Sequence, residues 1–417
     1  MQALILAAGR SSRFYPFNTS HKSCVSILGK SIIEHTIESV ARSGIKDIVV
    51  VVSQNSSVKK ILGEGKKFGV KISYIVQENP TGAGDAILQA RDYITSDFYL
   101  LNANRIEFAS FADLLLEKKK NSDNIVLLAR KESSLSSFGT LKIDGDTVLS
   151  IVEKPKKGEE PSDLKVVGLY LLPPSFIDLL TTVESDHYSL ENAISKAAGQ
   201  GKVKFVETSQ DTVSLKYPWD LLTIKDYLLK NSTSSISKNA NIAQGAQIIG
   251  KVVVEDGARI MEGAVIKGPA YIGKNVTVGT NAIIRGKSSI EEGAVIGARM
   301  EIKNSLIGKQ TTTHSGFIGD SVIGENCKIA AQFCTANVRL DRENVTIKTE
   351  TGKIDTLKQS LGVIMGENVF AGIRVSTMPG VIIGRNVTIG PQTVVMHNLE
   401  DDITFYSTFS ETVKKKK

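Results

Sequence analysis

The second half of the chain carries an aliphatic residue at every sixth position. The unbroken series is Ile236, Ile242, Ile248, Val254, Ile260, Ile266, Ile272, Val278, Ile284, Ile290, Ile296 and Ile302. Because six is an even number, these side chains share one face of an extended chain, whereas on a helix of about 3.6 residues per turn they would scatter. Glycines between them, such as Gly257 and Gly263, suit tight corners. The pattern therefore predicts a parallel β-solenoid of short strands rather than a sandwich with accidental spacing.

Residues 1 to about 230 show a different rhythm, in which apolar runs alternate with amphipathic stretches. The apolar runs are 3–8, 48–52, 72–76 and 98–101, and the amphipathic stretches are 32–43 and 83–93. This alternation predicts an α/β domain in which a mostly parallel sheet carries helices on both faces. Ligands of such sheets bind at the carboxyl ends of the strands.

The length of 417 residues exceeds one ordinary core, so at least two domains are expected. We expect an α/β domain at 1–230, a polar linker at 231–235, a solenoid at 236–400 and a tail at 401–417 that ends in a lysine run. The net charge of +7 comes from dispersed lysines, which favours a small anionic substrate over nucleic acid. The apolar runs are too short to span a membrane, so the sequence predicts a soluble, cytoplasmic protein.

A series of short motifs follows the predicted strands of the first half. They are Leu6-Ala7-Ala8-Gly9-Arg10-Ser11-Ser12-Arg13, His21-Lys22, Gln77-Glu78-Asn79-Pro80-Thr81-Gly82, Glu153-Lys154-Pro155, Gly168-Leu169-Tyr170 and Pro218-Trp219-Asp220. In order and spacing they resemble the signature of sugar-1-phosphate nucleotidylyltransferases. The solenoid resembles the acetyltransferase half of bifunctional N-acetylglucosamine-1-phosphate uridyltransferases, archaeal ones especially. The resemblance implies a Rossmann-like nucleotidyltransferase domain followed by a left-handed parallel β-helix of hexapeptide repeats.

The resemblance also implies a reaction for the first half. A sugar-phosphate oxygen attacks the α-phosphorus of a nucleoside triphosphate, and pyrophosphate leaves. Catalysis by such enzymes rests on positioning and on cationic stabilisation of the phosphate oxygens, with Mg²⁺ as the family's metal. The residues implied are Arg13 and Lys22 for the cationic roles, Ala7, Ala8, Gly9, Gln77 and Gly82 for the nucleotide, and Gly139, Glu153 and Gly168 for the sugar.

The chain departs from the family at both positions that should hold the metal. Asn104, in Ala103-Asn104, replaces the Asp of a Gly-Asp pair and offers a neutral amide. The second ligand, an Asn or Asp before Pro-Trp-Asp, aligns with Lys216, or with Tyr217 after a slip of one residue. Mg²⁺ prefers negatively charged oxygen donors, and an ammonium would repel it. Either nucleotidyl transfer is impaired in a diverged paralogue, or Lys216 replaces part of the metal's charge.

The solenoid carries a second candidate site where the spacing breaks after Ile302. The segment at 313–320 resembles the one that bears the family's catalytic histidine, which aligns with His314. The resemblance implies that His314 takes a proton from the attacking sugar amine, that Lys303 holds the sugar phosphate and that Asn337 assists. Phe317 departs from the family, which has a tyrosine there.

Residues 342–360 resemble a loop excursion of the archaeal relatives. The aliphatic spacing then resumes at Val363, Val369 and Val375 and finishes near Val395. Solenoids of this family usually form trimers, so the resemblance implies a homotrimer that binds acetyl-coenzyme A between coils of neighbouring subunits.

Three functions remain open at this point. The chain is an enzyme that acetylates a hexosamine 1-phosphate and has weakened nucleotidyl transfer, or it is a non-catalytic regulatory or scaffolding subunit that binds a sugar nucleotide beside an active paralogue. The third is an active nucleotidylyltransferase that makes a nucleoside diphosphate sugar with an altered metal site. The ligands expected are a nucleoside triphosphate or sugar nucleotide and a sugar 1-phosphate.

Overall fold

The computed structural model describes residues 1–54, 56–120, 122–132, 135, 138–349 and 352–415. These residues form two compact units. Unit 1 consists of Met1–Ser11, Ser20–Val25 and Ser31–Val213, and unit 2 consists of Ser12–Thr19, Ser26–Lys30 and Ser214–Lys417. The predicted linker at 231–235 thus lies inside unit 2, since residues 214–230 pack with the solenoid.

Unit 1 is built on one nine-stranded sheet. Its strands are β1 (Gln2–Ala7), β4 (Asp47–Val52), β5 (Lys71–Val76), β6 (Phe98–Asn102), β7 (Ile125–Lys131), β8 (Gly139–Asp144), β9 (Thr147–Glu153), β10 (Leu164–Leu172) and β11 (Val203–Thr208). They lie in the order β5-β4-β1-β6-β10-β7-β11-β9-β8. The β5-β4-β1-β6 run and the β7-β11 pair are parallel, whereas β10, β8 and β9 introduce antiparallel pairs. The sheet is therefore mixed where the sequence predicts a mostly parallel one, because apolar runs do not report strand direction.

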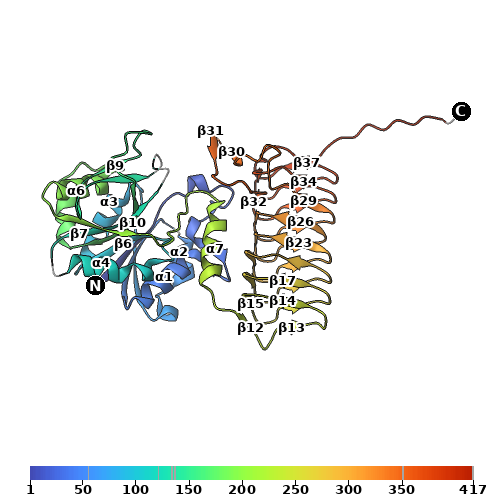
Figure 1. The fold of residues 1–417 in the computed structure, drawn as a ribbon, viewed down its shortest axis with the longest axis horizontal. Coiled ribbons are helices and arrows are strands. Elements are labelled where there is room, and N and C mark those ends of the chain that lie inside the picture. The colour runs from blue at the N-terminus through green and yellow to red at the C-terminus, as the bar shows by residue number, and fades with distance from the viewer. Residues whose placement is uncertain (55, 121, 133–134, 136–137, 350–351, 416–417) are drawn as a thin grey trace. The chain divides into compact units, whose positions relative to one another are not determined.

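Helices cover both faces of this sheet, as predicted (Figure 1). They are α1 (Ile32–Arg42), α2 (Ser57–Leu62), α3 (Ala83–Gln89), α4 (Ala112–Lys119), α5 (Ser175–Leu180) and α6 (Ser189–Ala198). Successive residues of β1 point to opposite faces, so Leu4 packs in a core with α3, α5 and α6, and Ile5 in a core with α1, α2 and α4. A capping box between Ser31 and Glu34 starts α1.

Unit 2 contains the predicted solenoid, whose strands form three parallel sheets (Figure 1). The first sheet has β12 (Ser235–Ile236), β15 (Val252–Val254), β18 (Ala270–Ile272), β21 (Ser288–Ile290), β24 (Leu306–Ile307), β27 (Val322–Ile323), β32 (Ile364–Met365) and β35 (Ile382–Ile383). The second has β13 (Asn241–Ile242), β16 (Arg259–Ile260), β19 (Thr277–Val278), β22 (Val295–Ile296), β25 (Thr312–Thr313), β28 (Lys328–Ile329), β33 (Phe370–Ala371), β36 (Thr388–Ile389) and β38 (Thr404–Phe405). The third has β14 (Gln247–Ile249), β17 (Val265–Lys267), β20 (Ile283–Ile284), β23 (Met300–Lys303), β26 (Gly316–Gly319), β29 (Phe333–Thr335), β34 (Ser376–Thr377) and β37 (Val394–Val395).

The sixfold aliphatic series forms the interior of the solenoid. From Val254 to Ile302 its members are at most 2% exposed, and each stacks on an equivalent residue of the next coil, as Ile266 stacks on Ile284. Ile236 is 49% exposed because it lies in the first coil, which has a neighbour on one side. The series therefore reports one face correctly, but burial also depends on the position of the coil in the stack.

The break in spacing after Ile302 corresponds to shorter coils. Ile284 pairs with Ile302, whereas Ile302 pairs with Ile318, two residues sooner. Residues 342–349 and 352–360 leave the stack, and β30 (Thr346–Thr349) pairs with β31 (Gly352–Asp355) as antiparallel strands. The solenoid ends later than predicted, because β38 pairs with β36 and takes residues 401–405 out of the expected tail.

The two short N-terminal segments of unit 2 are held by partly buried polar contacts with the solenoid. The backbone N–H groups of Leu28 and Gly29 donate to Glu291 Oε1 and Oε2, each at 2.9 Å. Gly29 has a φ of +78°, and a Cβ there would overlap the Tyr271 hydroxyl, so glycine suits both the turn and the close approach. The Tyr15 hydroxyl donates to Asp401 Oδ1 at 2.9 Å. Burial raises the pKa of the Glu291 carboxyl.

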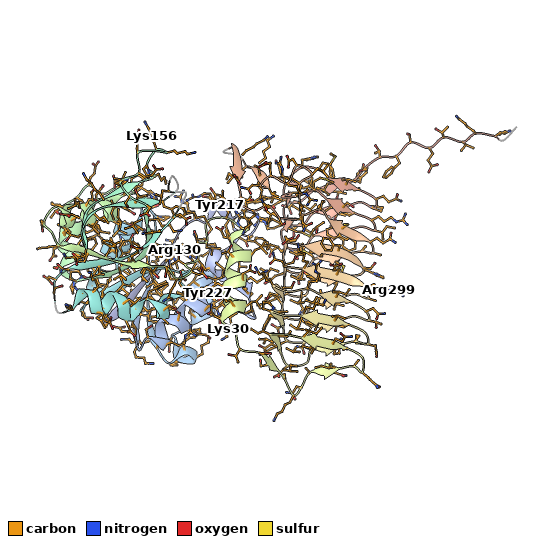
Figure 2. All side chains as sticks on the ribbon, viewed as in Figure 1. Lys30, Arg130, Lys156, Tyr217, Tyr227 and Arg299 are labelled. Carbon is orange, nitrogen blue, oxygen red and sulfur yellow. The ribbon has the colours of Figure 1, made fainter. Side chains whose placement is uncertain are left out.

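Unit 2 also includes the helix α7 (Asp220–Asn231), which packs against β24. Tyr217 precedes this helix and Tyr227 lies on it (Figure 2). Its apolar face buries Leu221, Ile224 and Leu229, with Lys225 among them. Asp220 Oδ2 accepts hydrogen bonds from the N–H groups of Lys216 and Tyr217 at 2.7 and 2.9 Å, which fixes the chain where the helix begins.

Truncating a buried member of the series should destabilise unit 2 strongly. Ile284→Ala removes a side chain that is 0% exposed, and we expect the free energy of unfolding to fall by about 2–5 kcal/mol. Ile236→Ala is the matched control, because that side chain is 49% exposed. Denaturant unfolding followed by the fluorescence of Trp219, the single tryptophan, measures both. Equal losses from the two variants would contradict a core of this kind.

Candidate active sites

The predicted nucleotide loop begins where β1 ends. Ala7 and Ala8 are buried, whereas Gly9 is exposed and a Cβ at that position would meet nothing within 4 Å. Lys22 starts a short 3-10 helix (Lys22–Cys24), and its backbone N–H donates to Ser11 Oγ at 3.0 Å. This bond ties the predicted cation to the loop after β1. Arg13 is exposed on a 3-10 helix (Ser12–Phe14) that belongs to unit 2.

His21 precedes Lys22 and stays neutral near pH 7. Burial lowers the pKa of its imidazole to about 3, and the adjacent Lys22 ammonium adds to the effect. Its Nδ1 lies 2.7 Å from Ser23 Oγ. The arrangement orders the backbone around Lys22 without placing a second positive charge beside it.

The residues predicted to bind the base are engaged with their own loop. Gln77 is 4% exposed, and its Nε2 donates to the Gly82 carbonyl at 3.2 Å and to Asp85 Oδ2 at 2.5 Å. A Cβ at Gly82 would lie 3.0 Å from the His187 carbonyl oxygen, so the backbone there is close to a neighbouring loop. Gln77 thus binds the residues at the N-terminus of α3.

The residues predicted to face the sugar fall in two places, Gly139 with Glu153 on one strand pair and Gly168 near the carboxyl end of β6. Gly139 pairs with Glu153 across β8 and β9, and a Cβ at Gly139 would overlap the Glu153 carboxylate. Gly168 lies in an irregular stretch of β10 with a φ of +78°, and a Cβ there would lie 3.3 Å from Asn102 Nδ2. Gly168 thus lies at the edge of the sheet where ligands of such folds bind.

Asn104, one of the two expected metal positions, lies two residues after β6. It is 5% exposed, and the preceding Ala103 fixes the turn through its N–H to the Leu6 carbonyl at 3.2 Å and its carbonyl to Thr36 Oγ1 at 3.1 Å. Lys216, the other position, is held through its backbone by Asp220 in unit 2.

These two side chains do not fit Mg²⁺. Asn104 offers one neutral amide oxygen, and the ammonium of Lys216 has no lone pair to give. Among the described residues, no group of three or more His, Cys, Asp or Glu side chains could hold a metal ion. We derive no catalytic step through a metal for this chain.

His314, the predicted acetyl-transfer base, lies between β25 and β26. Its side chain is exposed, and its backbone N–H donates to the Ile329 carbonyl at 2.9 Å. A Cβ at Gly297 would overlap the His314 carbonyl oxygen, so the corners of successive coils are in close contact here. The imidazole projects from a rigid corner into solvent.

Lys303 and Asn337, from the coils on either side of β26, meet at Asp320. Lys303 Nζ lies 3.0 Å from Asp320 Oδ2, and Asn337 Nδ2 donates to the same oxygen at 2.5 Å. A Cβ at Gly319 would lie 2.5 Å from the Phe317 ring and 3.1 Å from Asn337 Nδ2. The structure therefore brings Lys303 of β23 and Asn337, which follows β29, to the carboxyl end of β26, the strand that carries Phe317 and begins two residues after His314.

Sequence reasoning missed the two residues that organise this cluster, Asp320 and Lys225. Asp320 is the last residue of the segment 313–320. Its buried carboxylate accepts hydrogen bonds from Lys303 of the preceding coil and Asn337 of the following one. Lys225 has a side chain that is 0% exposed and donates to Asn304 Oδ1 at 2.8 Å. The sequence did offer a sign of this, because Lys225 falls among Leu221, Ile224 and Leu229 on the apolar face of α7. A lysine buried on such a face needs polar partners.

Lys225 should make the stability of unit 2 depend on pH. Burial lowers the pKa of its ammonium to about 8, with Lys287 acting in the same direction and Asp226 and Asp320 opposing it. Between pH 8 and about 10 the unfolded chain then binds more protons than the folded one, so the free energy of unfolding should rise with pH through this group.

Lys225→Met should remove that rise. Unfolding of both proteins across this pH range, followed by Trp219 fluorescence, measures the difference in slope. Lys238→Met is the control, because Lys238 is exposed and should leave the slope as in the parent protein. A Lys225→Met variant with the parental slope would contradict a charged, buried Lys225.

Comparison with known proteins agrees with both halves of the fold. A family model described as nucleotidyl transferase matches residues 2–231, and one described as bacterial transferase hexapeptide (six repeats) matches residues 362–397. The crystal structure of a putative glucose-1-phosphate thymidylyltransferase from Bacillus anthracis in complex with a sucrose has a similar fold, with a TM-score of 0.50 at 20% identity over 56% of this chain and 98% of that one. The fold thus defines a nucleotidyl transferase joined to a hexapeptide-repeat solenoid.

Relatives match over the full length. The bifunctional protein GlmU of Methanococcus maripaludis (strain C7) is 38% identical over 423 residues, which cover 100% of both chains. The bifunctional sugar-1-phosphate nucleotidylyltransferase/acetyltransferase of Sulfurisphaera tokodaii is 32% identical over 95% of this chain and 97% of its own. The chain belongs to this family of bifunctional transferases, as its motifs predict. Among the described helices, none is long and apolar enough to cross a membrane.

Proposed function

We propose that this protein transfers an acetyl group from acetyl-coenzyme A to the amine of a hexosamine 1-phosphate, and that His314 is the base. One observation carries the proposal: Lys303 and Asn337 meet at Asp320, directly after the strand that follows His314. An ammonium that suits a phosphate, an amide that suits a polar sugar and an exposed imidazole thus lie on adjoining coils.

In this reaction the amine nitrogen attacks the thioester carbonyl carbon while the His314 imidazole takes up the amine proton. A C–N bond forms and the C–S bond breaks. The thiolate of coenzyme A leaves and receives the proton from the imidazolium. Lys303 contributes charge to hold the sugar phosphate and takes no part in the proton transfer.

The proposal includes weakened Mg²⁺-dependent nucleotidyl transfer. The amide of Asn104 and the ammonium of Lys216 stand at the positions where the sequence predicts metal ligands. Loss of one such electrostatic element typically lowers a rate by roughly 10²–10³. The proposal leaves binding of a nucleoside triphosphate or sugar nucleotide to the loop after β1 and the Gln77 segment, which do not include these two side chains.

We also propose a homotrimer formed through the solenoid. Phe370 and Ile373 are each 50% exposed and Met396 is 71% exposed, although they lie on a regular stack. Large apolar side chains at such exposure favour contact with further copies of the chain. Sedimentation equilibrium tests this, and a monomer at micromolar concentration would overturn it.

Two assays on one preparation test the function. Thiol release from acetyl-coenzyme A should require glucosamine or galactosamine 1-phosphate. Pyrophosphate release from nucleoside triphosphates plus a sugar 1-phosphate should be slow or absent with Mg²⁺, Mn²⁺ or Co²⁺. No thiol release with either amino sugar would overturn acetyl transfer, and fast pyrophosphate release would overturn the weakened nucleotidyl transfer.

A further inference from the structure

Asp320 gathers side chains from three positions of the solenoid. Its Oδ2 receives Lys303 Nζ at 3.0 Å and Asn337 Nδ2 at 2.5 Å, and its Oδ1 receives Asn304 Nδ2 at 2.6 Å. The Asp320 side chain is 4% exposed, whereas that of Lys303 is 31% exposed. A buried acid therefore holds groups that themselves reach the surface.

A second layer lies behind this acid. Asn304 donates to Asp320 through Nδ2 and accepts from Lys225 Nζ through Oδ1 at 2.8 Å, so both ends of its amide are used. Lys225 also donates to the Lys287 carbonyl and lies 3.1 Å from Asp226. Buried polar groups linked in this way rigidify one another, because any rotation breaks more than one bond. The network fixes the orientation of the Asp320 carboxylate.

We infer that Asp320 is a positioning residue for the acetyl acceptor: it orients the Lys303 ammonium toward the sugar phosphate and the Asn337 amide toward the sugar itself. Asn304 and Lys225 hold Asp320 in place. The inference rests on the proposed acetyl transfer. It assigns Asp320 no part in the proton transfer.

Lys303 and Asn337 can each bind Asp320 and still bind the acetyl acceptor, because each has further donors or acceptors. An ammonium has three donors, so Lys303 can bind Asp320 and still offer donors to a phosphate from its exposed side. A lysine on a flexible stem otherwise loses rotamer entropy when it binds, and prior orientation lowers that loss. Because Nδ2 of Asn337 is bound to Asp320, the amide would meet the sugar through its oxygen, which can accept from a hydroxyl or amine.

Asp320→Asn tests the inference with little change of shape. The new amide has one oxygen in place of two and cannot receive Lys303, Asn304 and Asn337 together. Because hydrogen bonds to charged groups are at stake, the KM for glucosamine 1-phosphate should rise roughly tenfold to a hundredfold, whereas kcat and the KM for acetyl-coenzyme A should change little. Asp341→Asn is the control, because Asp341 is an exposed acid that pairs with Arg339 and should leave both KM values unchanged.

A double-mutant cycle separates positioning from general damage. If Asp320 acts through Lys303, Asp320→Asn should have little further effect on the KM in a Lys303→Ala background. Independent, multiplying effects would overturn the inference. Lys225→Met should raise the same KM by a smaller factor through Asn304, and an unchanged KM in this variant would overturn the part assigned to Lys225.

Folding and function can be told apart in this design. If Asp320→Asn does not fold, Asp320→Glu keeps the charge and shifts it by one methylene, and an unchanged KM in that variant overturns the inference. A wild-type protein that releases thiol while Asp320→Asn keeps its KM overturns the inference alone. A wild-type protein that releases no thiol overturns the proposed function and the inference with it.

Discussion

His314→Ala is expected to lower kcat for acetyl transfer by roughly 10²–10⁴, the usual contribution of a positioned general base. The KM for the hexosamine 1-phosphate should change little, since Lys303 and Asn337 remain on Asp320. Thiol release from acetyl-coenzyme A at saturating substrate measures the effect. Because the side chain is exposed, its removal should not alter folding.

His397→Ala is the matched control for this experiment. His397 is also an exposed imidazole of the solenoid, where it packs edge-on against Phe405 at 5.5 Å. It should leave kcat unchanged. Equal rates for His314→Ala and the parent protein would remove His314 from the mechanism and would favour a binding role for the solenoid.

The periodic parts of the fold could be predicted from the sequence, because their pattern follows from backbone geometry. An even spacing of aliphatic residues fixes one face of an extended chain, and Val254 to Ile302 are buried accordingly. Strand direction in unit 1 could not be read in the same way. The apolar run of β10 looks like those of β1 and β4, although it pairs antiparallel with β6 and β7.

Contacts between residues far apart in the sequence could not be predicted from the hydrophobic pattern either. Tyr15 binds Asp401, and the backbone at Leu28 and Gly29 binds Glu291, through contacts that link residues hundreds of positions apart. Neither partner belongs to a periodic series. Polar pairing of this kind depends on the tertiary structure, so the assignment of the short N-terminal segments to unit 2 came from the structure alone.

In the candidate sites, too, some residues could be predicted from the sequence and others only from the tertiary structure. His314, Lys303 and Asn337 were identified through a family motif, and Lys303 and Asn337 do lie together. Asp320 belongs to the same segment, 313–320, but the motif does not single it out, because its contacts form only when the adjoining coils are stacked. Lys225 lies in another part of the sequence and reaches the cluster through Asn304. The motifs thus identified Lys303 and Asn337 but not the buried residues that contact them.

Restoring the expected metal ligands should increase nucleotidyl transfer. The double variant Asn104→Asp, Lys216→Asn places a carboxylate and an amide where the chain has an amide and an ammonium. We expect Mg²⁺-dependent pyrophosphate release to rise by roughly 10²–10³, the size of one lost electrostatic element. Nucleoside triphosphate, sugar 1-phosphate and Mg²⁺ in a coupled pyrophosphate assay measure it.

The Asn104→Asp substitution by itself offers a second readout, the Tm, which does not need turnover. Asn104 is 5% exposed, so a carboxylate there is costly until a cation neutralises it. Mg²⁺ should therefore raise the Tm of Asn104→Asp, because a ligand that binds the folded state stabilises it by mass action. Asn102→Asp is the control, since Asn102 is exposed at the end of β6 and should gain little from Mg²⁺. A rise in Tm without pyrophosphate release would show that metal binding returns but that the sugar side is also altered. No response to Mg²⁺ in either readout would mean that differences beyond positions 104 and 216 prevent metal binding.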